Sequence, residues 1–321
     1  RVAVPDMDAP RAIGPIRRRI HIPLVADIHF DYRLALECVR QGVDKIRINP
    51  GNIGSAEKVR AVADACRDRG IPIRIGVNGG SLERELLQKY GGVTAQALVD
   101  SALGHVRLLN DCNFDDICIS VKCSHVPVNM EAYRMLHEQT HYPLHLGVTE
   151  AGNGIEGRVK SAVGIGALLA DGIGDTIRVS LTEAPENEIP VAQLLAEHFS
   201  ERPGRFEVLH PERYSPTEYR RRSRVTEPVV HTEPLEGFRV IEAVSGNPTA
   251  ELRAAILNLD VPDEPVVVKR RYEESSLETL AVKAAADLGP LLLDGLADGI
   301  WIDAPGFPED AVREVELTIL Q

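Results

Sequence analysis

Hydrophobic positions along the first two hundred residues follow two alternating patterns. Short runs rich in β-branched residues predict strands at Arg1–Val4, Pro23–His29, Lys45–Asn49, Pro72–Val77, Asp116–Lys122, Pro143–Val148 and Thr176–Leu181. Between these runs, apolar residues spaced three and four apart predict helices at Asp31–Gln41, Ser55–Arg69, Thr94–Asn110, Asn129–Thr140, Gly157–Asp171 and Glu186–His198. Such alternation implies parallel strands joined by right-handed crossovers, in an α/β sheet that is either doubly wound or closed into a barrel.

A second pattern of the same kind begins after a break. The segment 201–234 carries several prolines and the basic run Arg220–Arg224, which is typical of a connecting segment. Beyond it we expect a second α/β domain over 235–321, with strands and helices at Arg239–Val244, Thr249–Asn258, Pro265–Arg270, Leu277–Leu293 and Gly299–Asp303. The final stretch, Ala311–Leu320, has no visible cap, so we expect this domain to be cut short at its C-terminus.

The predicted strands of the first domain share one unusual feature, a polar face. Alternate residues of a strand point to opposite sides, and one side repeatedly carries charged, amide or hydroxyl groups, namely Arg1, Asp27, His29, Arg47, Asn49, Arg74, Asn78, Lys122, Ser124, Arg178 and Ser180. Strands of parallel α/β sheets are usually apolar on both faces, because helices cover both. A repeated polar face therefore favours a barrel interior, whose functional residues lie at the carboxyl ends of the strands.

Cations dominate this polar face, although the protein as a whole is acidic. Arg1, Arg47, Arg74, Lys122 and Arg178 would converge at one mouth. Several buried cations repel one another and lose hydration, a cost that a multiply charged anion such as a diphosphate offsets. We therefore predict an anionic ligand. Glu150 is the leading acid or base candidate, and His29 and His145 are interpreted as orienting or structural groups.

Composition narrows the class of protein further. The formal net charge of -12 and the pI near 5.4 argue against nucleic acid or an anionic membrane as the main partner. The sequence has no apolar run long enough to span a bilayer, so we expect a soluble protein. Its 5 cysteines include no C-x-x-C pair, which favours buried free thiols in a reducing compartment.

Six motifs in the first domain resemble those of one known family, the 4-hydroxy-3-methylbut-2-enyl diphosphate synthases. They are Pro-Leu-Val-Ala-Asp-Ile-His-Phe-Asp-Tyr (23–32), Arg-Ile-Asn-Pro-Gly-Asn-Ile-Gly (47–54), Arg-Ile-Gly-Val-Asn-Gly-Gly-Ser-Leu (74–82), Ser-Val-Lys-Cys-Ser (120–124), Leu-His-Leu-Gly-Val-Thr-Glu-Ala-Gly (144–152) and Gly-Ile-Gly-Asp-Thr-Ile-Arg-Val-Ser-Leu (172–181). The resemblance implies a TIM-like (β/α)8 barrel over 1–200, whose first strand is expected to be missing. The segment 235–321 resembles the insert domain of the large form of the family.

The resemblance also implies a substrate and roles for the polar residues. The substrate of the family is 2-C-methyl-D-erythritol 2,4-cyclodiphosphate, which is reductively opened and dehydrated in the methylerythritol phosphate pathway of isoprenoid biosynthesis. Family motifs place Arg1, Arg47, Arg74 and Lys122 on the diphosphate. They place Asp27, Asn49, Asn78, Glu150, Arg178 and Ser180 on the erythritol part or its diphosphate, with Glu150 as proton donor.

The family reaction also needs parts that this sequence lacks. A [4Fe-4S] cluster is held by three Cys and one Glu of a C-terminal domain, and none of the cysteines here matches those ligands. The resemblance further implies ferredoxin or flavodoxin as electron donor, leaves room for a homodimer, and suggests a cytoplasmic enzyme, or one of the plastid stroma in a plant-like source. The alternatives are a non-catalytic diphosphate-binding module and a non-redox barrel enzyme acting on a phosphorylated substrate, such as a pterin synthase.

Overall fold

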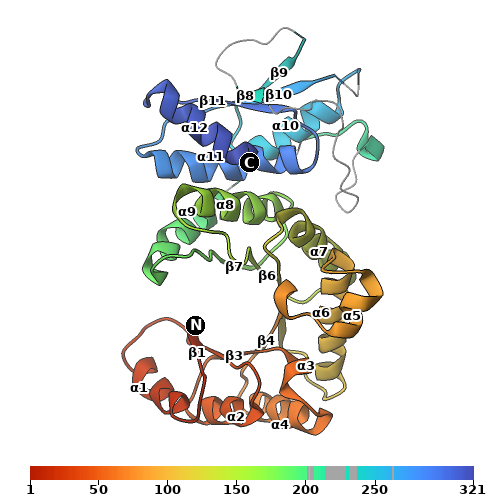
Figure 1. The fold of residues 1–321 in the computed structure, drawn as a ribbon, viewed down its shortest axis with the longest axis vertical. Helices are drawn as coiled ribbons and strands as arrows, with labels where there is room; N and C mark the ends of the chain where they lie inside the picture. The colour runs from red at the N-terminus through yellow and green to blue at the C-terminus, as the bar shows by residue number, and fades with distance from the viewer. Residues whose placement is uncertain (201, 203–205, 214–228, 231–236, 262–263) are drawn as a thin grey trace. The chain divides into compact units, whose positions relative to one another are not determined.

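The computed structural model describes all of residues 1–321 except 201, 203–205, 214–228, 231–236 and 262–263. The described residues form two compact units (Figure 1). Unit 1 comprises 1–122 and 139–145, and unit 2 comprises 123–138 and 146–321. The basic run Arg220–Arg224, and with it most of the predicted connecting segment, lies outside the described residues.

Unit 1 is built on a parallel sheet whose strands lie in sequence order. These strands are β1 (Val2–Ala3), β2 (Val25–Asp27), β3 (Lys45–Ile48), β4 (Ile73–Asn78) and β5 (Ile117–Lys122). In the register, Asp27 lies beside Arg47, and Arg47 lies beside Arg74. In-register neighbours of a parallel sheet share a face, so these three residues form one polar row. The isoleucines next to them in sequence, such as Ile46 and Ile73, are fully buried in the core.

Helices and turns connect these strands. They are η1 (Ala9–Ala12), α1 (Ile13–Arg17), α2 (Tyr32–Arg40), α3 (Pro50–Ile53), α4 (Ala56–Arg67), η2 (Gly79–Ser81), α5 (Arg84–Tyr90) and α6 (Ala95–Asn110). Side chains fix the starts of the long helices, since Asp31 accepts a hydrogen bond from the backbone of Arg33 and Thr94 from that of Ala97. The sequence predicted α2, α4 and α6. It missed α1, α3 and α5, which are too short to show a helical period.

The first part of unit 2 continues the alternation of strands and helices. Its elements are α7 (Val126–Gln139), β6 (His145–Gly147), α8 (Gly154–Ala170), β7 (Thr176–Arg178), η3 (Pro185–Asn187), α9 (Glu188–Ser200) and η4 (Pro211–Arg213), with β6 paired to β7. Both strands are shorter than predicted: β6 ends at Gly147, before Val148, and β7 ends at Arg178, before Val179. The residues that follow β6 and β7 lie in turns.

The C-terminal α/β segment, defined as residues 237–321, has its own parallel sheet. Its elements are β9 (Arg239–Ala243), α10 (Pro248–Leu257), β10 (Val266–Arg271), α11 (Leu277–Leu293), β11 (Gly299–Asp303) and α12 (Glu309–Leu320), and β8 (Val229–Val230) joins the sheet in the order β8-β11-β10-β9. The predicted bounds of α11 and β11 are confirmed. Figure 1 shows α10, α11 and α12 on one side of this sheet.

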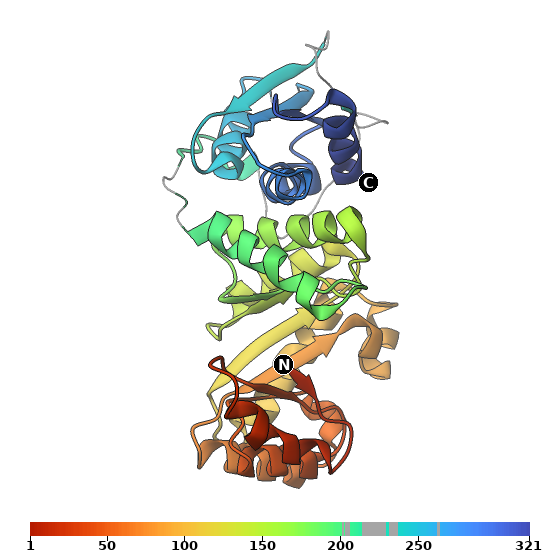
Figure 2. The same cartoon turned by 90° about the vertical axis from the view of Figure 1, so that its left-hand side faces the viewer.

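Helices α8 and α11 pack closely within unit 2, as both views of the ribbon show (Figure 2). Glycines permit the close approach: a methyl group added at Gly166 would lie 2.9 Å from the Cα atom of Ala286, and one at Gly289 would lie 2.6 Å from a methyl carbon of Val163. Backbone atoms therefore limit the distance between the two helices. This contact holds the C-terminal α/β segment against α8.

Two buried ionic clusters border this helix pair. In the first, Arg134 and Arg253 each pair with both Asp171 and Asp294, at distances between 2.7 and 3.1 Å. In the second, the fully buried Asp287 of α11 lies 2.8 Å from Nε2 of His198 on α9, and it also pairs with Arg202 and accepts a hydrogen bond from Tyr272. These ions are paired, as buried charges must be.

Candidate functional site

The polar row of unit 1 is organised around one carboxylate. Asp27, at the end of β2, pairs through Oδ2 with Nη1 of Arg1 at 2.9 Å and through Oδ1 with Nη1 of Arg47 at 2.9 Å. Asp27 and Arg47 are buried, whereas the side chain of Arg1 keeps 31% of its surface exposed. One carboxylate thus orients two guanidinium groups from the neighbouring strands.

Arg47 owes its position to a residue without a side chain. Its Nη2 donates to the carbonyl oxygen of Gly76 at 3.0 Å. Nη2 also lies 3.1 Å from the side-chain oxygen of Asn78, in the amide orientation that satisfies both groups. A methyl group at Gly76 would lie 2.6 Å from the guanidinium carbon of Arg47 and nearer still to its Nε, so only glycine leaves room for this arrangement.

Two further cations of unit 1 are buried close to this group. Arg74 is 7% exposed and Lys122 is also 7% exposed. Burial, reinforced by the positive charges of Arg1 and Arg47, lowers the pKa of Arg74 to about 10. The group therefore stays charged at neutral pH. Arg1, Arg47, Arg74 and Lys122 are called the cation cluster below.

The positive charges of the cation cluster also affect the pKa of His145. It is 7% exposed, at the start of β6. Burial lowers its pKa far below the usual range, and the charges of Lys122, Arg74 and Arg1 lower it further. His145 is therefore a neutral imidazole at physiological pH, which is compatible with an orienting role and unsuited to supplying another positive charge.

The remaining predicted residues of unit 1 lie at the carboxyl ends of the strands. Asn49 is buried and caps α3, since its Oδ1 accepts from the backbone N–H of Gly51 at 3.1 Å. His29 is exposed, with Nε2 at 3.6 Å from Oδ1 of Asp27. The structure thus brings Arg1, Asp27, Arg47, Arg74 and Asn78 together, and His29 lies at their edge.

The predicted residues of unit 2 lie on turns that share backbone hydrogen bonds. The N–H of Ala151 donates to the carbonyl of Ser180 at 3.4 Å, and the N–H of Thr182 donates to that of Gly152 at 2.8 Å. Glu150 is exposed and has φ of 53°, a left-handed conformation that is uncommon for residues other than glycine. Such strain often accompanies functional positions.

The other two predicted residues of unit 2 have simpler surroundings. Ser124 is exposed and lies two residues after the end of β5, next to Cys123. Arg178 ends β7, with its Nε 4.0 Å from Oε2 of Glu188. Both residues therefore lie at the carboxyl end of a strand, as the sequence predicted.

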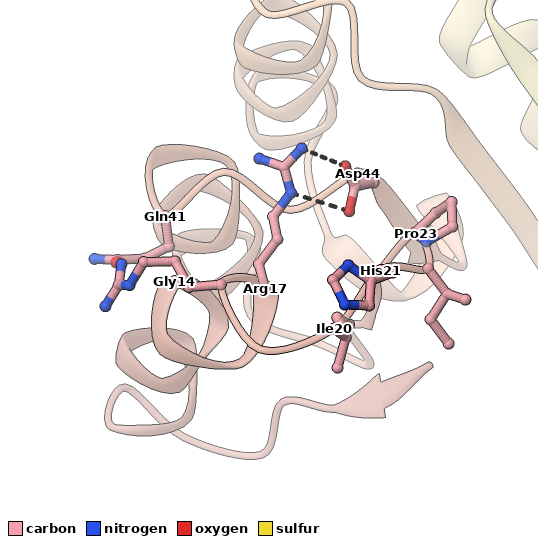
Figure 3. Close-up of a pocket in the computed structure, with 9 residues that line it drawn as sticks. Gly14, Arg17, Ile20, His21, Pro23, Gln41 and Asp44 are labelled. Atoms are coloured by element: carbon pink, nitrogen blue, oxygen red, sulfur yellow. Dashed lines mark hydrogen bonds and ion pairs between the residues drawn. The ribbon is translucent and has the colours of Figure 1, made fainter.

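A pocket near β2 lies at the ends of the strands opposite the cation cluster. It has a volume of about 520 Å³ and is bordered by Arg17, His21, Pro23, Gln41 and Asp44. Figure 3 shows Arg17 turned onto Asp44, which it contacts at 2.7 and 3.2 Å. Pro23 precedes β2 and Asp44 precedes β3, so the pocket lies at the amino ends of these strands. The cation cluster lies toward their carboxyl ends. This pocket is therefore separate from the predicted site.

Sequence reasoning missed two polar residues behind the site, Glu83 and His105. Nε2 of His105 lies 2.9 Å from Oε1 of Glu83, and the hydroxyl of Ser101 donates to the same oxygen at 3.1 Å. Ser101 and His105 are four residues apart on the buried side of α6. Two polar residues at this spacing on an otherwise apolar face were the available signal.

The cysteines do not suit an iron-sulfur cluster. All five are buried, and burial raises the pKa values of Cys38 and Cys66 to about 12, which disfavours the thiolate that binds metal. Among the described residues, no three His, Cys, Asp or Glu side chains form a group that could hold a metal ion. In the same part of the protein, no helix is long and apolar enough to cross a membrane.

Several curated proteins are similar to this chain over its first part. The 4-hydroxy-3-methylbut-2-en-1-yl diphosphate synthase (flavodoxin) of Ruminiclostridium cellulolyticum is 60% identical over 193 residues, which are 60% of this chain and 55% of that protein. The protein of the same name from Clostridium perfringens is 61% identical over 199 residues, 62% of this chain and 57% of the relative. The chain thus spans little more than half the length of these relatives.

Solved structures give a weaker likeness. A dihydropteroate synthase from Yersinia pestis has a TM-score of 0.42 and 11% identity, and covers 62% of this chain and 81% of that one. A likeness at this level carries no argument about function. The family is shown by the sequence, because the model of the GcpE TIM-barrel domain matches residues 1–193. The predicted α/β barrel class is thereby confirmed, and the chain belongs to the GcpE family.

Proposed function

We propose that this chain is the substrate-binding portion of a 4-hydroxy-3-methylbut-2-enyl diphosphate synthase, and that it binds 2-C-methyl-D-erythritol 2,4-cyclodiphosphate. The cation cluster carries the proposal: two of its four positive side chains pair with Asp27, and Arg74 and Lys122 are buried in the same unit. Mutual repulsion and lost hydration make this arrangement costly without a ligand. A diphosphate would offset both costs with charge-assisted hydrogen bonds.

The proposed roles follow the chemistry of each side chain. Arginine forks suit two phosphate oxygens at once, and the ammonium of Lys122 supplies a compact charge. We assign the diphosphate to the cation cluster and the erythritol part, or its diphosphate, to Asp27, His29, Asn49, Asn78, Ser124, His145, Arg178 and Ser180. Glu150 would donate a proton to the departing hydroxyl group, and its exposed carboxyl on a strained turn suits that task.

The reductive half of the reaction is assigned to parts other than the described residues. A [4Fe-4S] cluster would supply electrons, and the buried thiols here do not fit it. The names of the relatives support flavodoxin as the electron donor, with ferredoxin as the alternative. We further propose that residues 1–200 form the barrel and 235–321 an insert domain, in an enzyme of the bacterial cytoplasm.

Calorimetry with the cyclodiphosphate tests the proposal directly on this chain. We expect binding without turnover, and a loss of at least tenfold in affinity for Arg74→Ala, since a hydrogen bond to a charged group is worth about 1.5–3 kcal/mol. Arg69→Ala is the matched control, because Arg69 is exposed and follows α4. Absence of binding by the unaltered chain, or equal affinity of the Arg74 variant, would contradict the proposed site.

A further inference from the structure

The pair formed by Glu83 and His105 joins a buried histidine to a carboxylate that is 35% exposed, and it has no role in the function proposed above. His105 is 4% exposed on α6, and the contact from its Nε2 to Oε1 of Glu83 measures 2.9 Å. The hydrogen bond from His105 lowers the pKa of Glu83 to about 2. Glu83 is therefore an ionised acceptor at any working pH, and Nε2 of His105 is the donor.

This pair contacts the turn that follows β3. A methyl group added at Gly51 would lie 2.7 Å from Nε2 of His105 and 3.5 Å from Oε1 of Glu83. The backbone of Gly51 is thus seated against the pair. The N–H of the same residue donates to Oδ1 of Asn49 at 3.1 Å. Gly51 therefore connects the Glu83–His105 pair to Asn49.

The pair also belongs to the turn that follows β4. Asn78 is the last residue of that strand, η2 follows at Gly79–Ser81, and Glu83 comes directly before α5. Its carboxylate is anchored on α6 by both His105 and Ser101. The turn after β4 is thus attached to the same helix position that supports the turn after β3.

Apolar packing between the two turns and α6 would cost less free energy than this polar pair does. Oε2 of Glu83 and Nδ1 of His105 are buried and have no hydrogen-bond partner among the described residues, a situation that costs free energy. A directional hydrogen bond offers what apolar packing does not, a fixed distance between two turns.

We propose that Glu83 and His105 are positioning residues, which hold the turns carrying Asn49 and Asn78 in the arrangement that binds the diphosphate ligand. The inference rests on the proposed function for its ligand. The coupling of the two turns through α6 does not depend on any ligand. The two parts can therefore be measured separately.

The experiment compares His105→Leu with His105→Gln, whose amide can still donate to Glu83. Hydrogen exchange of the peptides covering 49–54 and 78–83 is measured without ligand, and affinity for inorganic diphosphate is measured by calorimetry. We expect His105→Leu to accelerate exchange in both turns and to weaken diphosphate binding about tenfold. His105→Gln should restore both readouts. His137→Leu, at an exposed histidine of α7, is the control.

Gly51→Ala provides a second route if His105→Leu fails to fold, since the added methyl presses on the imidazole without removing it. Unchanged exchange in both turns, in either variant, would overturn the positioning role. Altered exchange with unchanged diphosphate affinity would also overturn it. Failure of the unaltered chain to bind diphosphate would contradict the proposed function, while the exchange data would still decide whether the pair couples the turns.

Discussion

Gly76→Ala should disable the cation cluster without removing any charged group. The added methyl would occupy the space of the Arg47 guanidinium, whose carbon lies 2.6 Å from the position of the new atom. Gly76 lies inside β4 and has no left-handed backbone conformation, so alanine suits the strand itself. The substitution therefore acts by displacing Arg47, which supplies the three nearest atoms.

The expected loss of affinity follows from displacing the Arg47 guanidinium from the contacts that orient it toward the ligand. Its guanidinium holds Asp27 at 2.9 Å and the carbonyl of Gly76 at 3.0 Å. A hydrogen bond involving a charged group contributes about 1.5–3 kcal/mol, and 1.4 kcal/mol corresponds to about a tenfold change in affinity. Moving one ligand-binding guanidinium out of place should therefore weaken diphosphate binding by about 10- to 100-fold.

Calorimetry on a double-mutant cycle gives the assay. In an Arg47→Ala background the clash has no partner, so Gly76→Ala should have little further effect. Gly104→Ala, where the nearest atom beyond the helix backbone is 3.8 Å away, controls for adding a methyl group to unit 1. An equal loss of affinity from Gly76→Ala in both backgrounds would refute the steric reasoning, as would full binding by the single variant.

Three further variants test other parts of the structure. Arg74→Met should stabilise the unliganded protein by about 1–3 kcal/mol in thermal unfolding, because burial and the neighbouring cations disfavour the charged guanidinium and lower its pKa to about 10. It should also weaken diphosphate binding at least tenfold, as Arg74→Ala does, and a lower Tm would contradict the stability argument. Glu316→Gln should raise Tm more at pH 8 than at pH 5. Burial raises the pKa of Glu316 to about 7, so stability falls as pH rises from about 4.5 to about 7, and a pH-independent difference would reject the assignment. Gly166→Leu should lower stability by about 1–3 kcal/mol through its clash with Ala286, whereas Gly306→Ala, with open space around it, should not.

The alternation of residues along the strands predicted the polar row well. Arg47 and Arg74 were assigned to one face from sequence spacing, and the register places them side by side. Which partner each charge takes could not be predicted, because pairing depends on the alignment of strands distant in sequence. The role of Gly76 was equally hidden, since a missing side chain leaves no signal in a pattern of polar and apolar positions.

The helices show a similar division. The length of α11 was predicted to the residue from the recurrence of apolar residues through Leu293, and the structure shows that Ser276 caps its start. Its packing against α8 was not predicted. Helix α8 is buried nearly all around, so its sequence has no polar side to indicate which surface meets a partner. Glu150 was selected as an acid, but its left-handed backbone depends on hydrogen bonds between distant turns.

The glycine-mediated contact between α8 and α11 limits how this protein can be shortened by design. Trimming residues 237–321 would uncover a helix surface shaped around Gly166 and would leave Asp171 without Arg253. Arg134 would also lose its ion pair with the carboxylate of Asp294. A newly exposed apolar helix face favours aggregation. A minimal barrel would therefore require a redesigned outer surface on α8, with a larger polar residue in place of Gly166.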